Sequence, residues 1–319
     1  MDGDLLLHER EADRLAALHS LRVLDAGPMA ELDAVARIAA ALCGAPYGSV
    51  SVIDRDMHRT IASFGSPPMD APRSVSLCAR AILDGSLVHS ADVQIDPRFA
   101  DMPVLKLIQP PIRMFVAAPL TTRDGLPIGT IRVYDEVVRE LGERERAALI
   151  DLAALVMRLL ELRSQSSELY RLATHDALTG LPNRRVFSAL PIEQQPADYL
   201  LACVDLDGFK AINDEGGHIV GDEVLRVIAR RLRGAVENEG LAVRMGGDEF
   251  VLWLPAPHGA DALIERLSAL FEAPVMVDGR EWPVGATIGL SARMAGEGWD
   301  EWIARADGLM YRSKRVIRL

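Results

Sequence analysis

The sequence predicts an α+β protein in which two domains are joined by one long helix. The chain has 319 residues, which is enough for about two domains. In both halves, short runs typical of strands alternate with segments whose apolar residues recur at helical spacing. Between the halves, residues 143–173 contain neither glycine nor proline and predict a continuous helix. The expected order is an N-terminal helical lead over 1–20, a first domain over 21–142, the helix over 143–173 and a second domain over 174–319.

Composition and charge exclude several classes of protein. Apolar residues make up 49% of the chain and charged residues 25%, as in soluble globular proteins. The formal net charge of −11 disfavours a protein that binds a nucleic acid polymer. The acidic start at Met1–Asp4 lacks the basic residues of a signal peptide, and no apolar run approaches the ~20 residues of a membrane span. The sequence therefore predicts a cytoplasmic protein with no membrane segment.

The first domain is expected to be an antiparallel sheet with flanking helices. Apolar residues at helical spacing predict helices over 9–24, 29–43 and 78–83. Runs rich in β-branched and aromatic residues predict strands over 49–53, 60–64, 115–120 and 128–134. The stretch Arg123-Asp124-Gly125 predicts a hairpin turn between the last two strands.

The linker helix carries two sets of positions that repeat every seven residues. The first set is Leu155, Leu162 and Leu169, and the second is Leu152, Leu159, Ser166 and Ala173. Such a heptad pattern predicts a coiled coil in which the helix pairs with a second copy of itself. A single amphipathic helix packed on its own domain is the alternative reading.

The second domain is expected to alternate strands and helices. The predicted elements are strands over 199–205 and 284–291, a hairpin over 241–254, and helices over 221–235, 260–271 and 300–312. In the hairpin, Gly246-Gly247 supplies the positive φ of a tight turn and leaves Asp248 and Glu249 at the start of the second strand. The sequence contains neither of the usual glycine-rich nucleotide-binding loops.

Carboxylates and basic residues from separate segments indicate a metal and phosphate site. Asp205 ends a buried strand, which would hold its carboxylate rigidly, and Asp248 follows the glycine turn. Carboxylate oxygens suit Mg²⁺, which keeps phosphate oxygens as further ligands. Lys314 and Arg318 lie four residues apart on the last helix, where both could contact a triphosphate.

Taken together, these segments resemble the GGDEF domain, the catalytic module of diguanylate cyclases. The match spans 174–318 in the family's order and spacing, which makes the resemblance specific. The matching strings are Asp176-Ala177-Leu178-Thr179-Gly180-Leu181-Pro182-Asn183-Arg184, Asp205-Leu206-Asp207-Gly208-Phe209-Lys210, Asn213-Asp214, Gly217-His218 with Gly221-Asp222, Arg244-Met245-Gly246-Gly247-Asp248-Glu249-Phe250, and Ala306-Asp307 with Tyr311 and Lys314.

The resemblance implies a fold similar to adenylyl cyclases and polymerase palm domains. The implied reaction condenses two GTP into cyclic di-GMP and releases pyrophosphate. Two Mg²⁺ ions per active site, with Mn²⁺ as an alternative, would be held by Asp205, Asp248 and the backbone carbonyl of Leu206. Glu249 would either assist the metal or deprotonate the 3′-hydroxyl, and the sequence does not decide between them. The resemblance also places Lys210 among the catalytic residues, with Asp205, Asp248 and Glu249.

The resemblance also assigns the substrate contacts. Asn213 and Asp222 would bind guanine, and Phe209, Lys314 and Arg318 would hold the phosphates. Guanine presents two adjacent donors to one carboxylate, whereas adenine would leave that carboxylate unpaired, so Asp222 favours GTP over ATP. Because the product needs two GTP, two sites must face each other across the two-fold axis of a homodimer.

Two stretches depart from the family pattern. Many relatives carry an Arg-x-x-Asp site that binds the product and inhibits the enzyme. Here Glu237, Asn238, Glu239 and Gly240 occupy those positions. We therefore expect no inhibitory site in this chain. Near the C-terminus, Arg318 keeps its position but lacks the usual preceding glycine.

The first half resembles a GAF domain over about 20–165. The matching strings are Pro72-Arg73-Ser74 with Ser76-Leu77-Cys78, Asp96-Pro97-Arg98-Phe99-Ala100-Asp101, Ile112-Arg113 with Ala118-Pro119-Leu120, and Gly125 with Gly129-Thr130. The resemblance implies an unidentified small-molecule or protein signal that modulates the cyclase through the linker helix. We expect the homodimer to form through that helix and this domain.

Two other functions stay open at this level. One is a catalytically silent GTP-binding regulator that acts by protein contact, against which the retained Asp205, Asp248, Glu249 and Lys210 argue. The other is a cyclase that makes a different dinucleotide, which Asp222 disfavours. Turnover of GTP and the mass of the product separate these functions from a diguanylate cyclase.

Overall fold

The chain divides into two compact units, 1–167 and 168–319. The computed structural model leaves aside the side chains of 314–317 and describes residues 7–24, 27–106, 108–192, 199–236, 240–256 and 258–317. Helix α4 (Glu143–Thr174) runs through the division and confirms the continuous helix predicted over 143–173. Over the described ranges, no helix is both long enough and apolar enough to cross a membrane.

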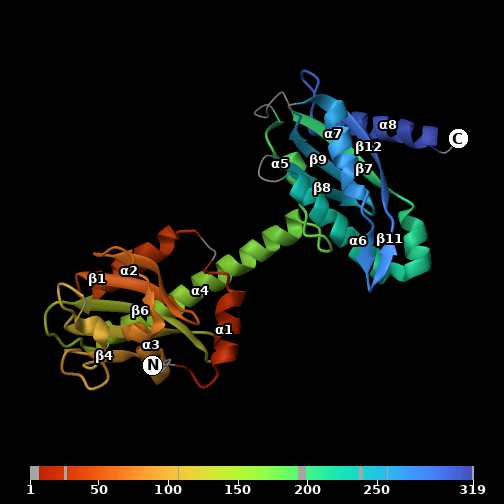
Figure 1. The fold of residues 1–319 in the computed structure, drawn as a ribbon. Coiled ribbons are helices and arrows are strands. Elements are labelled where there is room, and N and C mark those ends of the chain that lie inside the picture. Colours follow the sequence, from red (N-terminus) through yellow and green to blue (C-terminus); the bar gives the residue numbers. More distant parts are fainter. Residues whose placement is uncertain are drawn as a thin grey trace. The chain divides into compact units, whose positions relative to one another are not determined.

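Over its described residues, the first unit is built on an antiparallel sheet of six strands (Figure 1). In spatial order the strands are β3 (Ala71–Pro72), β2 (Met57–Phe64), β1 (Tyr47–Ile53), β6 (Pro127–Asp135), β5 (Met114–Thr121) and β4 (Val88–Ser90). The four predicted strands of this domain are confirmed, and each begins or ends a few residues further out. β3 and β4 were not predicted, because two or three residues are too few to show a period of two.

Helices cover both faces of this sheet. The helices are α1 (Glu11–Ser20), α2 (Ala30–Leu42) and α3 (Leu77–Ala81), with the 3-10 helices η1 (Arg73–Val75), η2 (Ile82–Asp84) and η3 (Pro103–Lys106). α1, α2 and the first half of α4 share a core with Val50 and Val52 of β1. α3 packs on Ile53, whose side chain points to the other face. Because side chains alternate along a strand, Ser49 and Ser51 also lie on the face of α3.

A buried ionic cluster fastens α1 to the sheet of the first unit. Arg14 and Arg73 are both fully buried, and both donate to the carboxylate of Glu11, at 2.7 Å and 3.1 Å. Arg14 also donates to the backbone oxygen of Ile53 at 2.6 Å, at the end of β1. Burial by itself would raise the pKa of Glu11, but the hydrogen bonds from the two arginines outweigh it and lower the pKa to about 2.

Over its described residues, the second unit contains an antiparallel sheet of four strands (Figure 1). In spatial order they are β12 (Gly285–Ala292), β7 (Tyr199–Asp207), β9 (Glu249–Pro255) and β8 (Leu241–Gly246). A separate hairpin is formed by β10 (Val275–Val277) and β11 (Arg280–Trp282). The predicted strands and the predicted hairpin of the sheet are confirmed, whereas the separate hairpin was not predicted.

Two pairs of helices cover the second sheet. The helices are α5 (Arg184–Ala189), α6 (Phe209–Val236), α7 (Gly259–Ser268) and α8 (Trp299–Ile317), with the 3-10 helix η5 (Ala269–Phe271). α6 and α7 pack on one face, and α5 and α8 on the other. α8 lies directly on β12, where a Cβ added to Gly289 would come within 2.3 Å of the backbone oxygen of Ala306. That glycine therefore permits the close approach of α8 to the sheet.

α6 differs from the sequence-based prediction. A helix was predicted over 221–235, but helical residues begin at Phe209. Gly217 breaks the helix with φ +78° and ψ 166°, so α6 consists of two helical segments joined by a kink. The first segment is short and contains the Gly216-Gly217 pair, which hid it from a search for helical periodicity.

Candidate functional site

The glycine turn between β8 and β9 has the predicted conformation. Gly246 has φ +153° and Gly247 has φ +53°, values that side-chain-bearing residues rarely adopt. Asp248 lies in the turn, and β9 begins at Glu249. Arg244 of β8 closes the turn by donating from Nε and Nη2 to the backbone oxygen of Gly247, at 3.0 Å and 2.7 Å.

Arg244 also links this turn to the segment that follows α4. Its Nη1 donates to Oδ1 of Asp176 at 2.8 Å, and that oxygen also accepts the backbone N–H of Thr179 at 2.8 Å. Burial would raise the pKa of Asp176, but the hydrogen bonds from Thr179 and Arg244 outweigh it and lower the pKa. Asp176 therefore stays ionised and holds the entry segment against the turn.

No role of its own was predicted for Arg244 from the sequence. Its side chain is only 10% exposed, although a charged residue inside the apolar run of β8 is costly unless it is paired. An arginine in an otherwise apolar strand was the signal that it has a partner. The partner could not be found from the sequence, because Asp176 lies 68 residues away.

The predicted metal ligands lie close together at the ends of two neighbouring strands. Asp205 of β7 is the register partner of Glu249 of β9, and the N–H of Leu206 donates to the backbone oxygen of Asp248 at 3.3 Å. Asp205 and Asp248 are half-buried, and Glu249 is exposed. The carboxylate of Asp248 forms no hydrogen bond or ion pair with another described side chain or backbone group.

The donor set at this strand end fits a hard divalent cation. Asp205 and Asp248 offer carboxylate oxygens, and the carbonyl of Leu206 lies on the same strand between β9 and β12. Among the described residues, no group of three or more histidine, cysteine, aspartate or glutamate side chains is placed to hold a metal ion. Two carboxylates would therefore leave coordination positions for a ligand's own oxygens.

The predicted guanine and phosphate residues lie at the start of α6 and beyond its kink. Gly208, with φ +74°, turns the chain from β7 into α6. Phe209 is then buried and Lys210 exposed. Asn213 and Asp222 are nine residues apart, but the kink brings the Asn213 side chain against Gly221. A Cβ added to Gly221 would lie 2.0 Å from Oδ1 of Asn213.

Three of the predictions concern parts of the chain that are wholly or partly outside the described residues. The side chain of Lys314 is not described, although α8 includes its backbone. Arg318 and residues 237–239 are outside the described residues altogether. The phosphate contacts of the C-terminal helix and the absence of an inhibitory site therefore stay predictions.

Comparisons with known proteins match both halves of the chain. Residues 173–318 match the family model described as "Diguanylate cyclase, GGDEF domain", and residues 30–161 match the model of the GAF domain. The chain is 35% identical over 207 residues to diguanylate cyclase DgcP of Pseudomonas aeruginosa, covering 60% of this chain and 31% of that protein. It is 32% identical over 177 residues to diguanylate cyclase VdcA of Vibrio cholerae, covering 52% of each.

Among solved structures, the chain is similar to a sensory box/GGDEF family protein from Caulobacter crescentus. The identity is 38%, the match covers 45% of this chain and 99% of that one, and the TM-score is 0.42. Among curated proteins, the chain spans 31% of the length of the first relative and 24% of the next two.

Proposed function

We infer that this chain, which belongs to the GGDEF family and carries a GAF domain ahead of its GGDEF domain, is a diguanylate cyclase. It condenses two GTP into cyclic di-GMP and releases two pyrophosphates. The observation that carries the proposal is the meeting of Asp205, Asp248 and Glu249 at one end of β7 and β9. Three carboxylates at a strand end, with Asp248 lacking a partner among the described residues, suit a reaction on phosphates.

Asp205, Asp248 and the carbonyl of Leu206 are the groups that we assign to Mg²⁺. When bound, the metal would stabilise the charge on the α-phosphate and promote loss of the 3′-hydroxyl proton. Glu249 follows Asp248 directly and is exposed, so it can reach a bound nucleotide. Lys210 projects from the first turn of α6, where a cation would favour the triphosphate. Lys314 and Arg318 complete the phosphate contacts in this proposal.

Asn213 and Asp222 form the guanine site in this proposal. The contact between Asn213 and Gly221 keeps the amide beside the residue that precedes Asp222. Neither side chain is hydrogen-bonded to another described residue, so both keep their donors and acceptors for a base. A carboxylate that accepts from both guanine donors rejects adenine, because adenine would leave it unpaired.

Replacing Asp222 tests the choice of base. We expect Asp222→Ser to lower the preference for GTP over ATP at least about 10-fold in a competition assay, with mixed products identified by mass. Asp214→Ser is the matched control, since Asp214 is exposed on the same helix. An unchanged preference for GTP in the Asp222 variant would contradict the assigned role.

The exposed face of α4 supports the proposed homodimer. Leu155, Leu162 and Leu169 are 46%, 61% and 68% exposed and repeat every seven residues. Leu152 and Leu159 of the second set instead pack on the core of their own unit. The alternative prediction, an amphipathic helix packed on its own domain, therefore holds for the second set. The three leucines of the first set remain exposed and available to a partner. We propose that a second copy covers these leucines and brings two active sites to face each other.

Sedimentation of the full chain tests the homodimer. We expect a dimer for the native chain, and at least ~10-fold weaker association for Leu162→Glu, because a carboxylate is costly in a coiled-coil seam. Ser167→Glu is the control, since it adds the same charge to an exposed position of α4 outside the two sets. A native chain that stays monomeric at high concentration would overturn the coiled coil.

We further propose that the GAF domain modulates the cyclase through α4 and that the chain lacks the usual product-inhibition site. The substituted residues Glu237 and Gly240 support the second point, because an acidic residue repels a phosphate that arginine would attract. Added cyclic di-GMP should therefore leave the initial rate unchanged. Strong non-competitive inhibition that disappears on changing residues 237–240 would contradict it.

Turnover of GTP by the full chain tests the proposed activity. With Mg²⁺ present, we expect pyrophosphate release and a product with the mass of cyclic di-GMP. Binding of GTP without turnover would favour the silent regulator instead. A product of another mass would indicate a cyclase with a different choice of base.

A further inference from the structure

A cavity of about 440 Å³ opens on the α3 face of the first sheet. Ser49 of β1 and Arg132 and Tyr134 of β6 form its floor, and the loops over 65–69 and 108–112 contribute its walls. Its volume is in the range of natural small-molecule sites. The proposed cyclase reaction makes no use of it.

Arg132 is charged, half-buried and without an acidic partner among the described residues. Its Nε donates to the hydroxyl of Ser49 at 2.7 Å, and its Nη1 donates to the sulfur of Cys78 at 3.1 Å. Neither acceptor is a carboxylate, and no described carboxylate lies within ion-pair distance. An arginine keeps its charge at any physiological pH, so the cavity floor carries an uncompensated positive charge.

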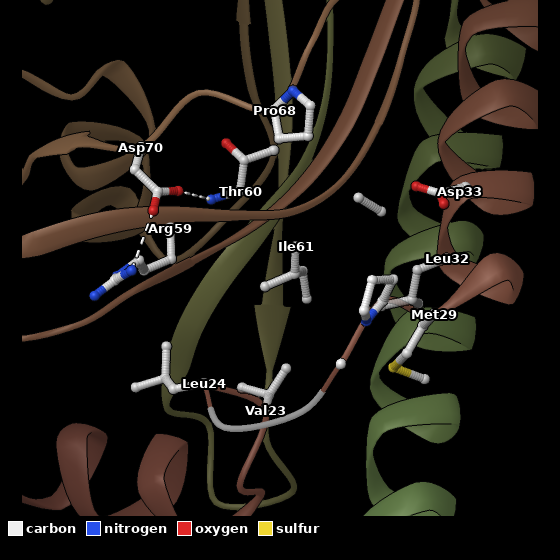
Figure 2. Close-up of a pocket in the computed structure, with 13 residues that line it drawn as sticks. Val23, Leu24, Met29, Leu32, Asp33, Arg59, Thr60, Ile61, Pro68 and Asp70 are labelled. Carbon is white, nitrogen blue, oxygen red and sulfur yellow. Dashed lines mark hydrogen bonds and ion pairs between the residues drawn. The ribbon is translucent and has the colours of Figure 1, made fainter.

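A neighbouring cavity shows the opposite arrangement. It measures about 330 Å³ and lies between α2 and β2 (Figure 2). There Arg59 pairs with Asp70 at 3.2 Å, and Asp70 also accepts the N–H of Thr60 at 2.9 Å. Asp33 accepts the N–H of Ser63 at 3.3 Å. Arg59 therefore has a carboxylate partner in its own cavity, whereas Arg132 has none among the described residues.

Further buried polar atoms without partners lie on the same face of the sheet, beyond the residues that line the cavity. Ser51 and Thr130 are register partners on β1 and β6, and both hydroxyls are buried without a hydrogen bond in the described structure. The Nε2 atom of His58, on β2, is buried and unpartnered in the same way. All three side chains share the sheet face of Ser49 and Arg132.

The walls of the Arg132 cavity suit a flat apolar body. The rings of Tyr47 and Tyr134 are stacked with centroids 4.8 Å apart, and Ile108 and Ile112 line the cavity beside them. Glu136 is the other charged lining residue and already accepts the hydroxyl of Tyr47 at 2.5 Å. It follows β6, which ends at Asp135. Arg132 is therefore the positively charged residue of the lining, and apolar surface lies next to it.

We propose that this cavity binds a small aromatic carboxylate, with the carboxylate on Arg132 and the ring against Tyr134 and the isoleucines. A single guanidinium matches a single negative charge, which favours a carboxylate over a doubly charged phosphate monoester. Only the effect of the bound ligand on the cyclase rests on the proposed sensory role of the GAF domain. Binding itself does not depend on cyclase activity.

Binding of indole-3-acetate to the full chain, measured by calorimetry and saturation-transfer NMR, tests the site. The uncharged indole-3-acetamide is the matched ligand, and benzoate and salicylate are further probes. We expect indole-3-acetate to bind at least ~10-fold more tightly than the amide, because only the carboxylate pairs with Arg132. Equal binding of acid and amide would overturn the proposal, as would no binding of any of the three carboxylates at about 10 mM.

Two variants and a control locate the site. Arg132→Gln should weaken indole-3-acetate at least ~10-fold and leave the amide nearly unchanged. Arg59→Gln removes an equal charge from the neighbouring cavity and should change the binding of neither the acid nor the amide. If Arg132→Gln fails to fold, Ser66→Trp tests the same cavity from its exposed loop and should abolish binding of both ligands. Unaltered binding of indole-3-acetate in folded Arg132→Gln or Ser66→Trp would refute the site, whatever the outcome of the GTP turnover assay.

Discussion

Charged side chains are used differently in the two halves of the chain. In the first unit, Glu11 lies between Arg14 and Arg73, whose side chains are fully buried and hydrogen-bonded to it. In the second unit, Asp248 lies in a turn at the end of the sheet, half-exposed and without a described side-chain partner. Charges that hold a fold are paired inside the chain, whereas a charge kept for a ligand is fixed through its backbone and left open.

This contrast predicts that similar substitutions have different consequences in the two units. Removing a carboxylate from the strand end should lower turnover and leave stability unchanged. Removing one from the buried cluster should lower stability. The four tryptophans help to separate the effects, because Trp253, Trp282, Trp299 and Trp302 all belong to the second unit. Tryptophan fluorescence therefore follows the unfolding of that unit alone.

The largest effect is expected for Asp248→Ala. Cyclic di-GMP formation should fall at least ~100-fold, because a metal-binding carboxylate at the reacting phosphate is lost. The urea midpoint measured by tryptophan fluorescence should not change, since the carboxylate forms no hydrogen bond or ion pair with a described residue. Asp261→Ala is the control, an exposed aspartate of α7 in the same unit. Substantial turnover by the Asp248 variant, with product confirmed by mass, would refute metal ligation.

A smaller effect, on stability, is expected for Glu11→Gln. The pKa of Glu11 is lowered from 4.5 to about 2 in the folded chain. Its ionised form therefore stabilises the first unit fully above pH 4.5, and this contribution is lost as the pH falls towards 2. After allowance for its partial exposure, we expect Glu11→Gln to destabilise the first unit by about 2–3 kcal/mol at pH 7. Near pH 2 the native chain and the variant should be equally stable.

Hydrogen exchange of β1 amides measures this loss in the first unit, and tryptophan fluorescence should show no change in the second. Asp13→Asn is the control, because Asp13 is 61% exposed and pairs with the exposed Arg10, which directly precedes the same helix. Such surface pairs contribute about 0–1 kcal/mol. A Glu11→Gln chain that stays as stable as the native chain at pH 7 would show that the cluster does not hold α1.

Much of this architecture follows from the sequence, and the exceptions have physical causes. Periodicity located the long strands and α4, because their apolar residues repeat over many positions. The glycine turn and Asp205 were located by residue type alone, since a turn and a strand end need little context. The pairing of Glu11 with Arg73 joins residues 62 positions apart and leaves no local pattern. The lack of an acidic partner for Arg132 likewise could not be predicted, because it depends on every residue that surrounds the cavity.

The kink of α6 is another feature that local pattern did not reveal, and it has a functional consequence. Gly217 allows the chain to fold back so that Asn213 lies against Gly221. The resemblance assigned Asn213 and Asp222 to guanine but implied no role for Gly221. In the structure, Gly221 is the position that leaves room for the Asn213 amide.

The smallest effect is expected for Gly221→Ala. The new Cβ would lie 2.0 Å from Oδ1 of Asn213, the end of a flexible side chain, so the amide should rotate away. We expect the KM for GTP to rise ~10-fold, equivalent to about 1.4 kcal/mol, because one hydrogen bond to guanine is lost. Gly234→Ala is the control in the same helix, where the new Cβ meets nothing within 4 Å. Both variants should gain up to ~1 kcal/mol of helix stability. A raised KM in both would trace the effect to the helix backbone, whereas a raised KM in Gly221→Ala alone would trace it to the Asn213 amide.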